Sequence, residues 1–177
     1  PESYFQHSAT GYAKGIEFVS RDRKSIKNFD YWISYSYLDT ERDFLNYPYA
    51  IQPNFAADHT ASLVMKRFFL DIKTGFNLTY SFATGRPYYR FVYDGATDKF
   101  AIADQGHTKE FHNLGFSLNY VPTVGNPNAK TFWVLVASVT NLLGYDPVFN
   151  YNYSYNGLNK QPVGLPAKRF YFVGVFF

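Results

Sequence analysis

The sequence predicts an all-β protein, namely a segment of an antiparallel transmembrane β-barrel with about seven long strands. Three observations predict this fold. Apolar residues recur at every second position, aromatic residues make up 21% of the 177 residues, and the connections between the alternating segments are short and long in turn. No apolar run approaches the roughly 18 residues of a membrane helix, so strands are the elements that could cross a bilayer.

Composition and charge exclude several other classes of protein. Because the chain has no cysteine, disulfide scaffolds, thiolate zinc sites and cysteine nucleophiles are excluded. The 17 basic and 14 acidic residues are interspersed, and a net charge of +3 leaves no electrostatic footprint for nucleic acid. No nucleic-acid partner is therefore expected. The many aromatic residues argue against disorder.

The first three strands are predicted near 11–20, 31–39 and 60–70. The first places bulky side chains on one face, at Tyr12, Ile16 and Phe18. The second does the same with Tyr31, Ile33, Tyr35 and Tyr37. The third follows the alternation less regularly. Each has about the ten residues that a tilted strand needs to cross a bilayer.

The fourth and fifth strands, near 75–84 and 111–121, alternate almost cleanly, and the last two lie near 131–141 and 169–177. The apolar positions of the fourth are Phe76, Leu78, Tyr80 and Phe82. Those of the fifth are Leu114, Phe116, Leu118 and Tyr120. Small polar residues fill the opposite face. A soluble sandwich is the alternative, but its strands would be nearer six residues and richer in Val, Ile and Leu.

The connections alternate in length along the whole chain. The shorter ones are Arg21–Asp30, Asp71–Thr74 and Pro122–Lys130. The long ones are Thr40–Asp58, Gly85–Lys109 and Asn141–Lys168. Outer-membrane barrels have short periplasmic turns and long extracellular loops. If Phe177 lies in the periplasm, every long connection lies outside the cell.

Seven strands cannot close a single-chain bacterial barrel, which has an even number of strands and no free edge. Either one strand is missing from the assignment, or the chain is one arc of a larger barrel. Residues 1–10 can be interpreted as part of a preceding loop, which favours the arc.

Several segments carry a family resemblance. They are Gly11–Phe18 (GYAKGIEF), Tyr31–Leu38 (YWISYSYL), Val136–Gly144 (VASVTNLLG) and Lys168–Phe177 (KRFYFVGVFF). In this order they resemble the late barrel strands of TonB-dependent outer-membrane receptors. Two further segments, Thr84–Tyr89 (TGRPYY) and Phe149–Tyr155 (FNYNYSY), resemble receptors of Bacteroidota type.

The resemblance implies a role in energised nutrient uptake at the bacterial outer membrane. Such receptors have a 22-stranded barrel, an N-terminal plug and a TonB box, so residues 1–177 would be the last seven strands, without plug or TonB box. The implied partners are outer-membrane lipid, the rest of the receptor and, through its N-terminal part, the TonB complex. A SusD-like surface lipoprotein is left open as a further partner.

Two other functions remain as alternatives. One is a receptor-like barrel that acts as a structural scaffold for a surface lipoprotein or a secretion complex. The other is a soluble β carbohydrate-binding module, which would have its strands packed in two layers. The transported ligand is not specified by the sequence.

The last strand resembles the signal that the barrel-assembly machinery reads. Its alternate positions are Tyr171, Val173, Val175 and Phe177. An aromatic C-terminus on an unrelated β protein is the alternative. The strand departs from the family pattern because Phe170, Phe172 and Phe176 make its second face apolar as well. These rings would pack on a plug or a partner, or the strand would be buried in a soluble protein.

Tyrosines in the long connections are the candidate ligand-binding residues. They are Tyr47, Tyr49, Tyr88, Tyr89, Tyr93, Tyr151 and Tyr153. Stiff rings with a hydroxyl group suit stacking on sugars, chelates or peptides at a low entropic cost. The alternative is that these rings pack on one another, which the alternation from Phe149 to Tyr155 also fits.

No residues indicate catalysis, and no metal or cofactor is predicted. The histidines show no HExxH spacing, and GxSxG is absent. The histidines are His7, His59, His107 and His112. A basic cluster in the first short connection is interpreted as a solvated turn near anionic headgroups or a plug. It consists of Arg21, Arg23, Lys24 and Lys27.

Overall fold

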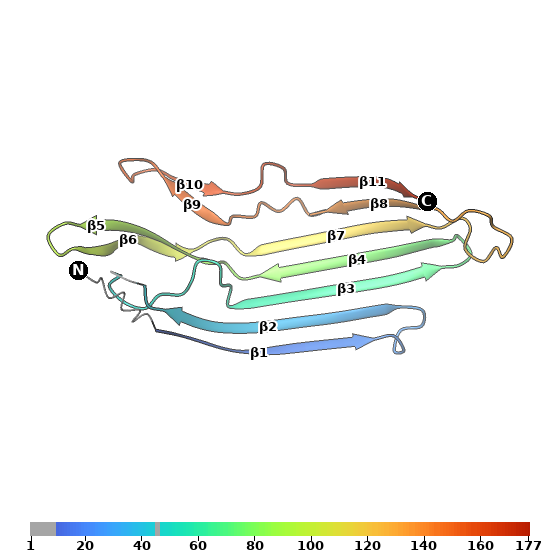
Figure 1. Cartoon of the computed structure of the whole chain (residues 1–177), viewed down its shortest axis with the longest axis horizontal. Coiled ribbons are helices and arrows are strands. Elements are labelled where there is room, and N and C mark those ends of the chain that lie inside the picture. Colours follow the sequence, from blue (N-terminus) through green and yellow to red (C-terminus); the bar gives the residue numbers. More distant parts are fainter. Residues whose placement is uncertain (1–9, 45–46) are drawn as a thin grey trace, which may run out of the picture.

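The computed structural model describes residues 10–44 and 47–177, so most of the proposed preceding loop, 1–10, lies outside the described residues. Within them the chain forms strands and loops (Figure 1). The strands are β1 (Gly11–Asp22), β2 (Asp30–Arg42), β3 (His59–Phe69), β4 (Thr74–Ala83), β5 (Pro87–Asp94), β6 (Lys99–His107), β7 (Phe111–Tyr120), β8 (Val134–Thr140), β9 (Asn150–Tyr153), β10 (Lys160–Val163) and β11 (Phe170–Phe176). No helix in these residues is long and apolar enough to span a membrane.

Seven strands form one antiparallel sheet, in the order β1-β2-β3-β4-β7-β8-β11. Figure 1 shows this main sheet as a single layer that follows the chain from its blue first strand to its red last strand. The other four strands form two hairpins, β5–β6 and β9–β10, inside two long connections. The predicted fold class, an antiparallel barrel segment with seven long strands, is confirmed.

The register of the main sheet places bulky residues in rows on one side. Met65 lies opposite Leu78, which lies opposite Phe116, and Phe116 lies opposite Val139. We call this side the apolar face. A barrel in a membrane turns such a face to the lipid.

The other side, which we call the polar face, carries small hydrogen-bonding residues in several rows, together with larger residues such as Trp32 and Phe68. The hydroxyl oxygens of Ser34 and Ser62 lie 2.7 Å apart, and Asn77 Nδ2 donates to Ser117 Oγ at 3.0 Å. These pairs satisfy one another across neighbouring strands, as expected of a face that lines a barrel interior.

The main sheet has no buried core of its own. The buried apolar and aromatic side chains among the described residues are Ile51, Ala56 and Tyr88, and all three lie in the long connections. On the sheet itself Ile16 is 69% exposed and Val173 is 74% exposed. An apolar face this open to solvent is stable only where something else covers it, and lipid does so in a membrane barrel.

The two ends of the sheet differ as the connection lengths predict. In Figure 1 the connections β1–β2, β3–β4 and β7–β8 lie at one end, and the three long connections lie at the other. Asn28 and Lys73 take left-handed backbone conformations (φ 66° and 52°) that close the first two turns. The alternation of short and long connections is therefore a real division into a turn end and a loop end.

The sixth strand is shorter than predicted. β8 begins at Val134, not near 131, because the preceding connection contains successive turns. Asn126 N donates to Thr123 O, and Ala129 N donates to Asn126 O. Trp133, just before β8, places its ring edge-on to Tyr120 at 6.3 Å, at the turn end.

Candidate functional site

The loop end of the sheet carries the two hairpins, which lie within connections predicted as long extracellular loops. Signals for both were present. Asp94-Gly95 and Asn156-Gly157 are dipeptides typical of hairpin turns. The runs from Tyr89 to Tyr93 and from Phe149 to Tyr153 alternate with period two, as strands do. The seven candidate tyrosines are distributed between these hairpins and the connection 43–58.

A β-bulge decides which side chains of the β5–β6 hairpin face which neighbour. Arg90 pairs with Asp104, but Phe91 pairs with Ile102, so Ala103 is left as the extra residue. Because side chains alternate along a strand, one extra residue moves everything beyond it to the opposite face. Asp104 therefore shares a face with Arg90 and not with Ile102.

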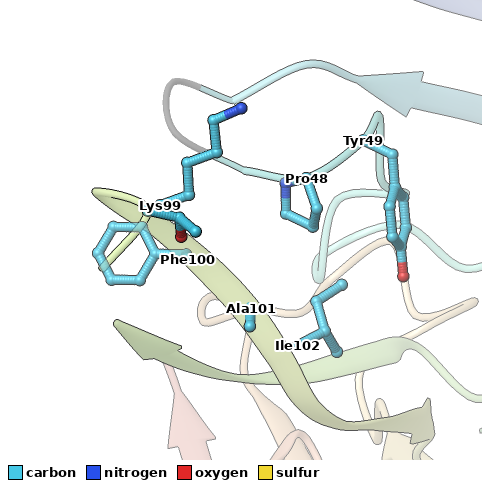
Figure 2. Close-up of a pocket in the computed structure, with 7 residues that line it drawn as sticks. Pro48, Tyr49, Lys99, Phe100, Ala101 and Ile102 are labelled. Atoms are coloured by element: carbon cyan, nitrogen blue, oxygen red, sulfur yellow. The ribbon is translucent and has the colours of Figure 1, made fainter. Parts of the chain in front are cut away.

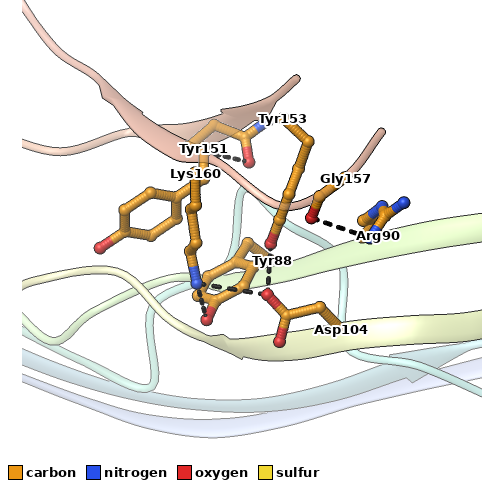
Figure 3. A network of polar contacts seen from close by, with 8 residues as sticks. Tyr88, Arg90, Asp104, Tyr151, Tyr153, Gly157 and Lys160 are labelled. Carbon is orange, nitrogen blue, oxygen red and sulfur yellow. Dashed lines mark hydrogen bonds and ion pairs between the residues drawn. The ribbon is translucent and has the colours of Figure 1, made fainter. Parts of the chain in front are cut away.

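The face with Asp104 contacts the β9–β10 hairpin through a polar and aromatic network (Figure 3). Lys160 Nζ lies 3.7 Å from the centre of the Tyr88 ring and 4.3 Å from that of Tyr151, and it donates to the Tyr88 hydroxyl. It also lies 3.4 Å from Asp104 Oδ2, to which the Tyr153 hydroxyl donates at 2.5 Å. We call these five residues, together with Arg90, the hairpin bridge.

Arg90 fixes the tip of the β9–β10 hairpin. Its guanidinium lies 5.3 Å from the centre of the Tyr153 ring, and its Nη1 donates to the Gly157 carbonyl at 3.3 Å. Gly157 has a left-handed backbone conformation (φ 71°), and a Cβ atom there would overlap the guanidinium of Arg90. Glycine is thus required at this position both for its backbone conformation and for the close approach of Arg90.

The hairpin bridge shifts the pKa values of its own groups. The hydrogen bond from Tyr153, helped by the charge of Lys160, holds the pKa of Asp104 below its ordinary value. Burial raises the pKa of Tyr153, and the bond to Asp104 raises it further. Desolvation works to lower the pKa of Lys160, but the contacts with Tyr88, Tyr153 and Asp104 outweigh it and raise that pKa. Near neutral pH Asp104 is therefore a carboxylate, Lys160 an ammonium group and Tyr153 a neutral phenol.

The opposite face of the β5–β6 hairpin packs against the connection 43–58. The Tyr47 ring stacks on Phe91 with 4.2 Å between centres and meets Phe100 edge-on at 5.9 Å. Tyr89 stacks on Phe91 at 5.9 Å, and Tyr93 meets Phe100 at 5.7 Å. Burial raises the pKa of Tyr89. These rings hold the connection and the hairpin together.

An open hollow of about 650 Å³ lies beside this aromatic packing (Figure 2). Figure 2 shows the Tyr49 ring on one side and the Ile102 side chain below it. Tyr49 is 53% exposed, and its hydroxyl donates to Gln105 Oε1 at 3.3 Å. The hollow is lined by Pro48, Tyr49, Thr97, Lys99, Phe100, Ala101 and Ile102. It offers apolar and aromatic surface with one ammonium group at its edge.

The structure distributes the candidate tyrosines over three environments. Tyr88, Tyr151 and Tyr153 belong to the hairpin bridge, and their rings pack on Lys160 and on each other, as the alternative interpretation expected. Tyr47 and Tyr89 are packing residues. Of the seven, Tyr49 and Tyr93 are more than half exposed, and Tyr93 donates its hydroxyl to the neighbouring Asp98. The hollow itself was missed, because Lys99, Phe100 and Ile102 carry no motif.

Three of the four predicted assembly-signal residues lie on the apolar face of the terminal strand. Tyr171 lies opposite Val139, Val173 opposite Ala137, and Val175 opposite Leu135. Phe177 follows the strand and is fully exposed. The three extra phenylalanines point to the polar face, and they are Phe170, Phe172 and Phe176.

The histidines lie in ordinary structural positions or outside the described residues. His59 and His112 accept or donate one hydrogen bond each through Nδ1, to the hydroxyls of Tyr35 and Tyr80 at 2.8 Å. His7 falls outside the described residues. Within residues 10–44 and 47–177 no three His, Asp or Glu side chains are grouped as a metal site would require.

Comparisons with known proteins identify the fold. Neither the protein-family models nor the curated proteins gave a match. Among solved structures, the chain is similar to the outer membrane transporter YddB from Escherichia coli, with a TM-score of 0.69 and 12% sequence identity. The match covers 94% of this chain and 25% of that one, so the chain spans about a quarter of the transporter's length. The fold is therefore that of an outer-membrane transporter barrel.

Proposed function

We propose that the chain is the C-terminal barrel arc of a TonB-dependent receptor of Bacteroidota type in the bacterial outer membrane. It contributes wall and three extracellular loops to energised nutrient uptake and carries out no chemistry of its own. The observation that carries this proposal is the single sheet with one lipid-type face, one polar face and all long connections at one end. The likeness to an outer-membrane transporter supports it.

The loops have two distinct roles in this proposal. The hairpin bridge ties β5–β6 to β9–β10 and gives the mouth of the barrel a fixed shape. The hollow beside Tyr49 makes the first contact with the nutrient, because it combines exposed aromatic surface with room for a small molecule. The ammonium group of Lys99 at its edge favours a nutrient that joins a flat apolar part to an acidic group.

The experiment uses the natural full-length polypeptide in its own bacterium. Growth medium with a defined mixture of sugars, peptides, iron chelates and cobalamin is sampled by mass spectrometry. We expect one class of nutrient to be depleted by wild type and spared by a strain without the gene or without TonB. The double substitution Tyr49→Ala with Ile102→Asp should slow that depletion about tenfold, since it removes a stacking ring and puts a charge in the hollow.

The matched control is Tyr155→Ala, because Tyr155 is a fully exposed loop tyrosine outside the hollow and the bridge. It should leave depletion unchanged. If wild type and the strain without the gene consume every compound equally, the uptake proposal fails. The alternative of a scaffold for a surface lipoprotein or a secretion complex would then be favoured.

A further inference from the structure

Arg67 is a cation on the apolar face of the main sheet. It lies opposite Phe76, which lies opposite Leu118, so it interrupts an apolar row two residues before β3 ends. This position is at the turn end of the sheet, the periplasmic end in the proposed function on which this inference rests. A charge at such a place in a barrel requires a partner in the membrane or at its surface.

The protein itself holds the guanidinium of Arg67 between two rings. The Cζ atom of Arg67 lies 4.2 Å from the centre of the Phe69 ring and 4.9 Å from that of the Phe29 ring. Phe29 is placed there by the β1–β2 turn, in which Phe29 N donates to Ile26 O and Asn28 is left-handed. The side chain is therefore fixed in position, unlike a lysine or arginine that extends freely to the headgroups.

The guanidinium is positioned but left without an anion. Its Nε is buried, and no hydrogen-bond acceptor in the described residues reaches it. Arg67 forms no ion pair within residues 10–44 and 47–177, although other arginines at this end do, such as Arg21 with Asp30. Since buried polar groups are normally satisfied, an acceptor from outside the chain is expected here.

An apolar groove runs from Arg67 along the same face. It has a volume of about 140 Å³ and is lined by Phe29, Met65, Arg67, Phe69, Phe76, Asn77, Leu78 and Phe116. The groove therefore starts at a cation near the turn end and continues over hydrocarbon side chains toward the middle of the sheet. This is the layout that a molecule with an anionic head and a hydrocarbon tail would fill.

We propose that this groove binds one glycerophospholipid of the periplasmic leaflet. Its phosphodiester accepts hydrogen bonds from the Arg67 guanidinium, whose fork matches two phosphate oxygens, and an acyl chain lies over Met65, Leu78 and Phe116. The β1–β2 turn that brings Phe29 to Arg67 also carries Lys24 and Lys27, whose charges favour an anionic headgroup. The phosphodiester supplies the hydrogen-bond acceptor that the buried Arg67 Nε lacks within the described residues.

Native mass spectrometry of the full-length protein in detergent, with added dioleoylphosphatidylglycerol, tests the proposal. We expect wild type to retain the lipid and Arg67→Leu to lose about tenfold in apparent affinity, the effect of one charge-assisted contact. Arg67→Lys should be intermediate, because an ammonium group cannot form the fork. Lys14→Met is the matched control, since Lys14 is a cation on the same face, paired with Asp39 at 3.1 Å.

A second variant tests whether the acyl chain of the lipid lies in the groove. Met65→Ser should weaken retention of the dioleoyl lipid but not of a dihexanoyl lipid with the same headgroup. Equal retention by wild type, Arg67→Lys and Arg67→Leu would overturn the site. Tighter, Arg67-dependent binding of lipid A would overturn its assignment to a glycerophospholipid. A heat-dependent shift in gel mobility confirms in each variant that the barrel is folded.

The outcome also separates this inference from the proposed function. If the protein takes up its nutrient but the Arg67 variants retain lipid as well as wild type does, only the proposed lipid site is contradicted. A protein that does not fractionate with the outer membrane contradicts both.

Discussion

Glycine at position 157 allows a close approach of the Arg90 guanidinium that a Cβ atom would block. Its carbonyl accepts from Arg90, and its left-handed backbone conformation is strained for residues with a Cβ atom. We expect Gly157→Ala to destabilise the hairpin bridge by about 1–2 kcal/mol from the backbone alone, with an added clash against Arg90. Faster hydrogen exchange in residues 150–163 of the variant would show this destabilisation.

Gly125 supplies the control for that substitution. It has a similar backbone conformation (φ 78°), but a Cβ atom there would meet nothing within 4 Å. Gly125→Ala should therefore destabilise only the turn end, through backbone strain, and should leave hydrogen exchange in the hairpins unchanged. If both substitutions leave residues 150–163 equally protected, the contact with Arg90 does not hold the hairpin tip.

Asp104 makes the hairpin bridge sensitive to acid. Because its pKa is lower in the folded loops than in an unfolded chain, the carboxylate stabilises the bridge above its ordinary pKa of 3.8. That stabilisation is lost as the pH falls from about this value through the depressed pKa. We expect the two hairpins to separate over this pH range. In the Asp104→Asn variant we expect them to be separated already at neutral pH.

The distance between two spin labels measures this separation. The chain has no cysteine, so cysteines introduced at Thr97 and Leu158 can be labelled selectively. A label distance that is the same in the wild type and in Asp104→Asn at neutral pH would contradict the role given to Asp104.

At the scale of elements, the bulge at Ala103 lets β6 keep Asp104 opposite Arg90 and Ile102 opposite Phe91. Deleting Ala103 would remove the bulge and leave both pairs in a regular ladder, so Asp104 should still face Lys160 and Tyr153. We expect residues 150–163 to keep their exchange protection after this deletion, as should β4 and β7, which pair independently. Ala103→Val keeps the chain length and should also preserve the hairpin bridge. Loss of protection in residues 150–163 after the deletion would contradict the assignment of Ala103 as the extra residue.

The main-sheet strands could be predicted from sequence because their environment repeats every two residues. Leu78 and Phe116 alternate with Asn77 and Ser117, and that pattern alone predicts which side of the sheet is apolar. The strand β10 could not be predicted because it has four residues and contains Pro162, which weakens any strand signal. The bulge at Ala103 has no signature in the sequence, so the partners of Asp104 could not be predicted.

The same limit applies to Arg67 and to the hollow. Period two places Arg67 with Leu63 and Met65, so its face could be predicted. Its two rings could not be, because Phe29 arrives from a turn in another connection. Lys99 and Tyr49 likewise come together through loops that are distant in sequence. Alternation specifies what each strand faces, whereas sites built between connections depend on tertiary packing.

For the whole molecule, the exposed apolar face and the free edges of β1 and β11 lead to a prediction about size and solubility. Unpaired strand edges in lipid would cost several kcal/mol for each backbone group. We expect the natural polypeptide to be several times larger than 20.5 kDa and to remain folded only in detergent or lipid. Intact mass, measured on samples with and without detergent, tests both points. A folded 20.5 kDa species free of detergent would instead favour a soluble carbohydrate-binding module.

The absence of a buried core in the main sheet has a consequence for how the sequences of barrel walls diverge during evolution. A side chain that meets fluid hydrocarbon has no fixed neighbour whose shape it must match, so Leu, Val, Ile and Phe can replace one another at little cost. At positions such as Asn77 and Ser117 on the polar face, a side chain needs only to be small and able to form a hydrogen bond. Two walls can thus share a fold at a TM-score of 0.69 with 12% of residues identical. Evolutionary drift should be slowest at the hairpin bridge, where each partner constrains the next.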